Sequence, residues 1–249
     1  MCFHKRLEGA LGDDRYGLRA SDIATGKTYV MKVILFGASG MVGQGILREC
    51  LLDDGVQKVL SVGRSAIGCT RAKFAEIVLA DLMRIADVDP ALEGYYTCFD
   101  SLGVSSAGMS EAHYTQQTYE LTLTIAKALV SRNASMTFIY VSGAGTDSSE
   151  RGRVMWARVK GRTENALLAL PFKGAYMFRP GAIHPLHGAR SKTAAYRVFY
   201  TLLGPIMLLL KRAWPEYVTT TEQIARAMLQ VAREGAPKRV LESSDINAV

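Results

Sequence analysis

The sequence predicts an α/β fold, in which a doubly wound parallel sheet carries helices on both faces within a single domain. From Met31 onward, short apolar runs alternate with longer helical patterns, as in parallel βαβ units. The chain has 249 residues, 49% of them hydrophobic and 21% charged, which suffices for one large α/β core. We therefore expect one domain over residues 31–249. Residues 1–30 are polar and lack a clear period, so we interpret them as an N-terminal extension, either an appended or poorly ordered leader or a short ordered segment.

The expected elements follow in strand–helix order along the chain. A helix is expected directly after Gly40, and Thr219-Thr220-Thr221-Glu222 has the pattern of a capping box that opens a late helix. The polar loop 147–150 is expected to cap the helix that follows it. We expect strands at 32–36, 58–62, 76–80, 96–99, 137–141 and 175–178, helices near 111–132, 153–168 and 221–233, and a last strand at 239–242.

A glycine-rich turn lies between the first strand and its helix. Gly37 permits a tight turn, Gly40 lets the main chain approach a diphosphate, and Gly43 allows the helix to pack closely on the strand. The helix N-terminus then presents free N–H groups and the positive end of its dipole. In this context the turn predicts a dinucleotide-binding Rossmann fold rather than a fortuitous turn. The expected cofactor contacts are Gly37, Ser39, Gly40, Met41, Val42 and Gly43.

The end of the second strand favours NADP over NAD. NAD-binding units usually carry an acidic residue about 20 positions after the glycine turn, which holds the ribose 2′-hydroxyl. The stretch 61–65 has no carboxylate, and the guanidinium of Arg64 suits a 2′-phosphate, with a solvated loop arginine as the alternative. Asp81 and Leu82 are expected at the adenine edge, with a helix cap as an equal alternative. Leu102 and Gly103 are expected to bring main chain close to the cofactor.

The charge and the composition of the chain limit the kinds of partner that we expect. The net charge of +7 is spread without a block of five or more cations, so we expect no nucleic acid, and we predict no metal site. The apolar run 198–210 is too short to span a bilayer; we expect it to pack inside the domain, with peripheral membrane contact as the alternative. The four cysteines are scattered and the first 30 residues lack a secretory signal, so we expect reduced thiols in a cytoplasmic protein.

Seven segments together resemble a known superfamily. They are GASGMVG, VGR, ADL, CFDSLG, YVSGAG, WARVKGRTE and FRPGAI, and they fall in the order and spacing of the atypical short-chain dehydrogenase/reductases. The chain is most similar to the NAD(P)-dependent epimerase/dehydratase-like branch that includes the Tat-interacting-protein oxidoreductases, from about Met31 to the C-terminus. The resemblance implies that Ser142 orients a substrate carbonyl, that Lys160 binds the nicotinamide ribose, and that Pro180 and Gly181 pass beside the nicotinamide.

The sequence departs from that family at its catalytic tyrosine, which corresponds to Trp156. An indole N–H is far too weak an acid to replace a phenol, and general acid–base catalysis is worth about 10²–10⁴-fold. Trp156 could instead shield the Lys160 stem within the site, with a modest cation–π contribution, pack in the core away from the cofactor, or stack a planar substrate. Other proton donors that could reach the pocket are Tyr114, His113, His184 and His187.

We therefore predict an NADPH-dependent oxidoreductase that acts on a small acceptor, such as a quinone, a flavin or a carbonyl, in a cleft shaped by the C-terminal segment. A non-catalytic NADP-binding regulatory or redox-sensing module is the alternative. A sugar-nucleotide epimerase or dehydratase is third, because that chemistry depends on the missing tyrosine. The sequence leaves the oligomeric state open.

Overall fold

A seven-stranded parallel sheet forms the centre of the fold, in the order β3-β2-β1-β4-β5-β6-β9. The computed structural model describes residues 30–190, 214 and 217–249. The chain builds outward from β1 to β3 on one side and from β4 to β9 on the other, so the doubly wound parallel sheet is confirmed. The strands are β1 (Met31–Phe36), β2 (Val56–Gly63), β3 (Phe74–Val78), β4 (Thr97–Asp100), β5 (Thr137–Val141), β6 (Gly174–Arg179) and β9 (Val240–Glu242).

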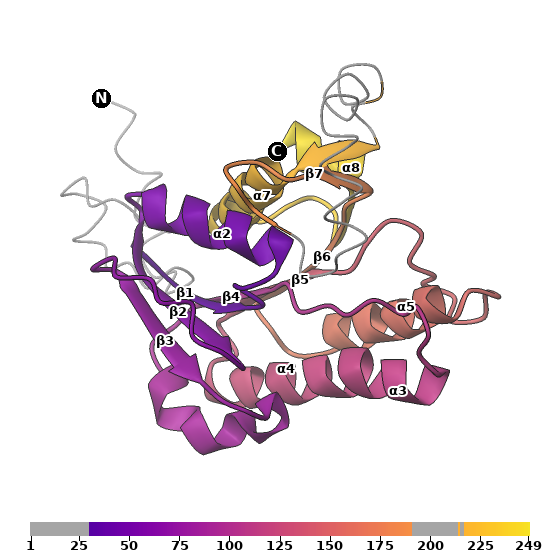
Figure 1. Ribbon diagram of the computed structural model, residues 1–249, viewed down its shortest axis with the longest axis horizontal. Coiled ribbons are helices and arrows are strands. Elements are labelled where there is room, and N and C mark those ends of the chain that lie inside the picture. The colour runs from indigo at the N-terminus through magenta and orange to yellow at the C-terminus, as the bar shows by residue number, and fades with distance from the viewer. Residues whose placement is uncertain (1–29, 191–213, 215–216) are drawn as a thin grey trace, which may run out of the picture. The chain divides into compact units, whose positions relative to one another are not determined.

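Helices cover both faces of this sheet (Figure 1). Helices α2 (Met41–Leu52) and α7 (Thr221–Glu234) pack side by side on one face. The other face carries α5 (Met155–Leu168) and a continuous helical segment made of α3 (Glu111–Thr115), the π-helical turn η3 (Gln116–Glu120) and α4 (Leu121–Arg132). The remaining elements are the 3₁₀ segment η2 (Leu82–Leu92), the short parallel pair β7 (Ala182–His184) and β8 (Val218–Thr220), and α8 (Ser243–Ala248).

The core between the sheet and the α4–α5 face is apolar, as the strand pattern predicts. Side chains that point to this face from alternate positions of the strands are fully buried, among them Phe36, Phe138 and Tyr140. Ile125 and Leu129 of α4 pack onto them. None of the helices in the described part of the chain is long and apolar enough to cross a membrane.

Most expected elements are present, with three corrections. β3 occupies 74–78 rather than 76–80, because Phe74 pairs with Val59 of β2. Thr220, the last residue of β8, caps α7 in place of Thr219 by accepting from the Gln223 main-chain N–H at 3.0 Å. Loop 147–150 does not cap α5: the N-cap position is Val154, which makes no side-chain cap. The N-terminal extension and the apolar run 198–210 lie outside the described residues, apart from Val30.

Candidate functional site

The glycine turn after β1 has the geometry of a phosphate cradle. Gly37 adopts φ +80°, and its carbonyl oxygen accepts from the Gly40 N–H at 2.8 Å. A Cβ at Gly43 would lie 2.0 Å from that same oxygen, so only glycine lets α2 begin this close to β1. Gly40 is the N-cap of α2 and provides no side-chain cap. No side chain at Gly40 therefore caps the first N–H groups of α2, which include those of Met41 and Val42. Such uncapped N–H groups suit an anion.

The neighbouring strand fixes the floor of this turn. Ser101 follows β4, and both its N–H and its hydroxyl donate to the Phe36 carbonyl, at 3.1 and 2.8 Å. A Cβ at Gly37 would lie 2.7 Å from Ser101. The cradle therefore sits at the switch point between β1 and β4, where doubly wound sheets bind ligands.

Arg64 lies at the same edge of the sheet. It follows β2, whose Val62 pairs with Phe36, and its side chain is exposed. It makes no hydrogen bond or ion pair with another described residue, so its guanidinium is available to a ligand. The paired N–H groups of a guanidinium suit a 2′-phosphate.

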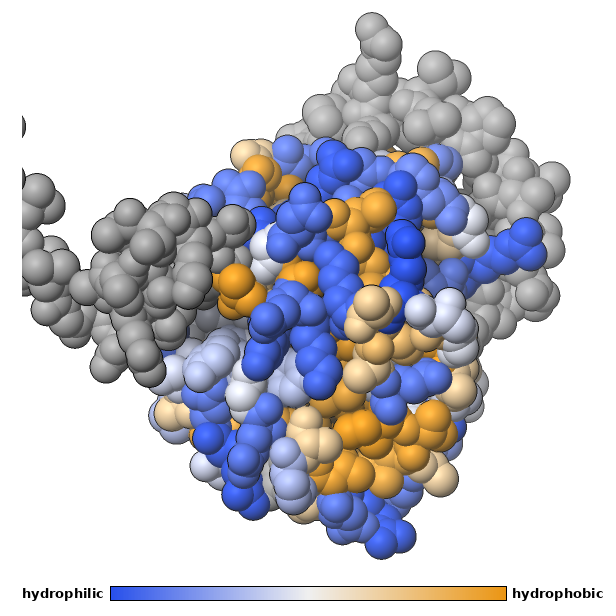
Figure 2. All heavy atoms as spheres, turned by 90° about the vertical axis from the view of Figure 1, so that its left-hand side faces the viewer, coloured by the Kyte–Doolittle hydropathy of each residue, from blue (hydrophilic) through white to orange (hydrophobic). Residues whose placement is uncertain are grey.

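The end of β3 agrees better with the helix-cap interpretation. The Asp81 side chain accepts from the Met83 N–H at 2.9 Å and so caps η2. The Leu82 side chain is buried in the core, which leaves only its main chain at the edge. Val78 and Met83 are exposed nearby. Figure 2 views the left-hand side of Figure 1 and shows hydrophobic patches among hydrophilic side chains.

Lys160 lies inside the site, where the pKa of its ammonium group is lowered. Its Nζ donates to the Ser142 carbonyl at the end of β5, and burial lowers its pKa to about 8 against the opposing attraction of Glu164 and Asp100. Ser142 and Lys160, for which the sequence predicted separate roles, thus lie together at the carboxyl end of β5. Trp156 lies one turn before Lys160, half-buried, with its ring 3.5 Å from where a Gly145 Cβ would stand. Lys160 is in none of the cation–π pairs of the described residues, so that contribution is not seen.

Ser142 is engaged by a carboxylate that the sequence reasoning missed. Its hydroxyl donates to Glu164, which is buried and receives two nitrogens of Arg179. Arg179 also donates to Glu242 at 3.2 Å. Glu164 is four residues after Lys160, as Lys160 is four after Trp156, so helical spacing could have found it. The Ser142 hydroxyl is thus within hydrogen-bond reach of the Glu164 carboxylate and of the Phe178 carbonyl.

The remaining predicted residues flank this network. The Pro180 carbonyl accepts from the Ala144 N–H at 2.9 Å, which holds the turn after β6 beside the loop after β5. The Gly181 N–H donates to Ser243 at 2.7 Å. The Leu102 N–H donates to the Asp100 carboxylate at 2.8 Å, and a Cβ at Gly103 would meet open space.

The four alternative proton donors differ in position. Tyr114 is buried and its pKa is raised by burial. His113 is exposed on α3, and His184 is buried in β7. His187 lies 2.6 Å from Glu222 of α7, in the strap of chain after β7.

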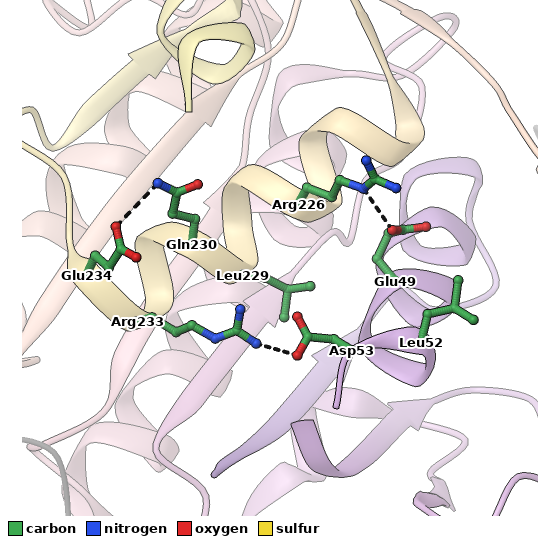
Figure 3. A pocket seen from close by; sticks show the side chains of 8 residues that line it. All are labelled: Glu49, Leu52, Asp53, Arg226, Leu229, Gln230, Arg233 and Glu234. Carbon is green, nitrogen blue, oxygen red and sulfur yellow. Dashed lines mark hydrogen bonds and ion pairs between the residues drawn. The ribbon is translucent and has the colours of Figure 1, made fainter. Parts of the chain in front are cut away.

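A hollow lies at the end of the sheet opposite the glycine turn. It holds about 540 Å³ between α2 and α7 (Figure 3). Ion pairs of Arg226 with Glu49, at 3.1 Å, and of Arg233 with Asp53, at 2.5 Å, bridge the two helices there. Each of these two arginines of α7 is thus paired with a carboxylate of α2.

The chain is similar to fungal proteins of one family. No family model matches it. "Protein fmp52, mitochondrial" of Emericella nidulans is 30% identical over 193 residues, which cover 74% of this chain and 81% of that protein. The chain belongs to the FMP52 family. "Protein FMP52, mitochondrial" of Eremothecium gossypii is 28% identical and covers 87% of the chain and 96% of its own length.

Solved structures share the fold of this FMP52-family chain. An oxidoreductase of the short chain dehydrogenase/reductase family from Burkholderia thailandensis gives a TM-score of 0.61 at 17% identity, over 87% of this chain and 93% of that one. The Bordetella bronchiseptica enzyme WbmF in complex with NAD+ and UDP gives 0.63 at 14% identity, over 89% and 76%. These structures confirm the fold that the resemblance to atypical short-chain dehydrogenase/reductases implies.

The expectation of a cytoplasmic protein is wrong, because both FMP52 relatives carry the word mitochondrial in their names. The expectation used the lack of an apolar secretory core near the start of the chain. Mitochondrial targeting segments are amphipathic and need no such core, so its absence did not bear on this compartment.

Proposed function

We propose that this FMP52-family chain binds NADP(H) at the glycine turn and reduces a small acceptor such as a quinone or a flavin. The observation that carries the proposal is the uncapped N-terminus of α2 beside Gly37 and Gly40, which suits a diphosphate. Arg64, exposed and without a protein partner among the described residues, supports the choice of NADP over NAD. The mitochondrial names of the relatives support a mitochondrial location.

The residues present restrict the chemistry. When bound, the dinucleotide supplies a hydride. Lys160 contributes a partly buried positive charge that orients a ribose hydroxyl or stabilises a developing anion. Trp156 offers no acid, and the Ser142 hydroxyl is held by Glu164. The site therefore suits an acceptor whose reduced form takes its proton from water or from a group that does not contact it. It suits less well a ketone, whose reduction needs a phenol as the proton donor.

The states of Ser142 and Trp156 also favour a second candidate, a non-catalytic NADP-binding regulator. Ser142 and Trp156 occupy the two positions that the wider family uses to act on a carbonyl; here the Ser142 hydroxyl donates to Glu164, and the Trp156 indole is too weak an acid. The cradle and Lys160 do not depend on them. Binding without turnover is therefore the alternative outcome.

The test joins calorimetry to an acceptor panel. The purified chain is titrated with NADPH and NADH, and NADPH oxidation is followed with quinones, flavins, aldehydes and ketones. Acceptor-dependent oxidation supports the oxidoreductase, binding with no turnover supports the regulator, and no binding refutes both. Arg64→Ala should weaken NADPH by about tenfold and NADH by less. Arg71→Ala, which removes an exposed cation later in the same loop, should affect neither.

A further inference from the structure

The Ser142 hydroxyl has a single proton, and the protein groups around it take that proton. The hydroxyl donates to the Glu164 carboxylate and lies 3.2 Å from the Phe178 carbonyl oxygen. Neither group can donate in return. A main-chain carbonyl has no proton, and Glu164 is ionised because two nitrogens of the Arg179 guanidinium pair with it. The network therefore fixes the direction of the hydrogen bond, in which Ser142 is the donor to the protein.

The oxygen of the same hydroxyl keeps its capacity to accept. A hydroxyl oxygen has two lone pairs, and none of the residues that the structure describes donates to the Ser142 Oγ. Ser142 follows β5 at the edge where parallel sheets bind ligands, and 7% of its surface is exposed. A ligand group that faces Ser142 thus meets an acceptor. This differs from the role that the resemblance implies, because a serine that orients a substrate carbonyl must donate to it.

Lys160 places a hydrogen-bond donor beside this acceptor. Its Nζ donates to the main-chain oxygen of Ser142, the same residue that carries the accepting hydroxyl. An ammonium group has three N–H bonds, so two of them remain for a ligand. A ligand with a carbonyl oxygen next to an N–H would satisfy both Lys160 and Ser142. Such an edge, in which C=O and N–H alternate, is that of an amide or an imide.

We propose that the acceptor of this chain is a flavin, whose imide edge gives its N–H to the Ser142 Oγ and a carbonyl oxygen to Lys160. The inference rests on the proposed reductase function and selects between its acceptors. An oxidised quinone has carbonyl oxygens but no N–H or O–H of its own, so it would leave the Ser142 oxygen unpaired. The oxidised isoalloxazine ring has one N–H, at N3, between two carbonyl groups.

The reaction balances without a further protein donor. The dihydronicotinamide gives one hydride to the isoalloxazine ring, and solvent gives one proton, which yields the dihydroflavin and the oxidised coenzyme. Ser142 and Lys160 contact the flavin and orient it. Glu164 is a positioning residue, because it acts only by taking the proton of Ser142.

The first arm of the test measures binding without turnover. The chain saturated with NADP+ is titrated with lumiflavin and with 3-methyllumiflavin, which carries a methyl group in place of the N3 proton. Because one hydrogen bond is lost, lumiflavin should bind about tenfold more tightly than its methyl derivative. Equal Kd values, or binding of neither flavin, overturn the proposal.

Variants show which group reads the N3 proton. Ser142→Ala removes the acceptor and should bring the ratio of the two Kd values to about one. Glu164→Gln should do the same, because Arg179 holds the amide oxygen and the amide N–H groups then donate to Ser142. Ser148→Ala is the matched control: its exposed hydroxyl accepts from the same Arg179 at 2.5 Å, and its loss should leave the ratio at about ten. Ser142→Ala decides the matter should Glu164→Gln not fold, and a ratio that stays near ten in Ser142→Ala overturns the proposal.

The second arm follows NADPH oxidation and separates this inference from the reductase function. The KM for lumiflavin should be about tenfold below that for 3-methyllumiflavin, while kcat differs by less than about threefold. Turnover of quinones or flavins without selectivity for the N3 proton refutes the flavin assignment and leaves the reductase standing. Selective flavin binding without NADPH oxidation refutes the reductase, and with it a flavin as its substrate.

Discussion

Substituting alanine at Gly40 or at Gly43 should separate binding from folding. At Gly40 the main chain is extended, with φ −81° and ψ 164°, and an added Cβ would meet only the Gly37 oxygen, at 3.3 Å. Alanine fits that backbone, and replacing an N-cap glycine costs a few tenths to about 1 kcal/mol. The methyl group would nevertheless stand where the main chain must approach a diphosphate. Loss of one charge-assisted hydrogen bond costs about 1.5–3 kcal/mol, so NADPH affinity should fall about 10–100-fold.

Gly43 should behave in the opposite way. Its added Cβ would lie 2.0 Å from the Gly37 oxygen, so α2 must move by more than about 1 Å, and overpacking of this kind costs about 1–3 kcal/mol or more. Urea denaturation measures the stability of both variants, and calorimetry measures NADPH binding. A Gly40→Ala chain that folds normally and binds NADPH as tightly as the wild type would refute the placement of the diphosphate.

Three further predictions follow from the site. Trp156→Tyr should create or raise carbonyl reduction with NADPH, because it places a phenol one turn before Lys160; no gain in a variant that still binds coenzyme contradicts that placement. Because burial raises the pKa of Asp100 from 3.8 to about 7, the folded state binds an extra proton in this window, and the free energy of unfolding should fall by up to about 4 kcal/mol as pH rises through it. Asp100→Asn should flatten that slope in urea titrations, and a wild-type slope in the variant would count against the buried carboxyl. Glu164→Gln removes the charge that pairs with Arg179 and should cost about 3 kcal/mol in the same assay; a cost below about 1 kcal/mol would show that the ion pair is not structural.

The sequence predicted the sheet well because its strands are long apolar runs bounded by turn residues. Each of the six strands predicted up to residue 178 corresponds to a strand of the structure. Only β3 is displaced by two residues, because its register depends on pairing with β2 rather than on its own pattern. The three-residue strands β7 and β8 were not among the strands predicted from the sequence. The π-helical turn Gln116–Glu120 has no sequence signal in the helical pattern around it.

The site was predicted where the backbone dictates it and missed where side chains meet across the sheet. The glycines of the cradle follow from steric rules that hold in any such turn. Lys160 follows from its spacing to Trp156. Asp100 and Tyr140 belong to different strands 40 residues apart, and their proximity depends on the β4–β5 register, which the sequence alone does not state. The same holds for the contact of Ser142 with Glu164, which passes from β5 to α5.

The central claim is that the main chain at the start of α2 grips a diphosphate. A crystal structure of the chain grown with NADPH tests it most directly. We expect diphosphate oxygens about 2.7–3.2 Å from main-chain nitrogens between Gly40 and Val42, with the 2′-phosphate at Arg64. Coenzyme bound at another edge of the sheet, or density for none at saturating concentration, would contradict the account.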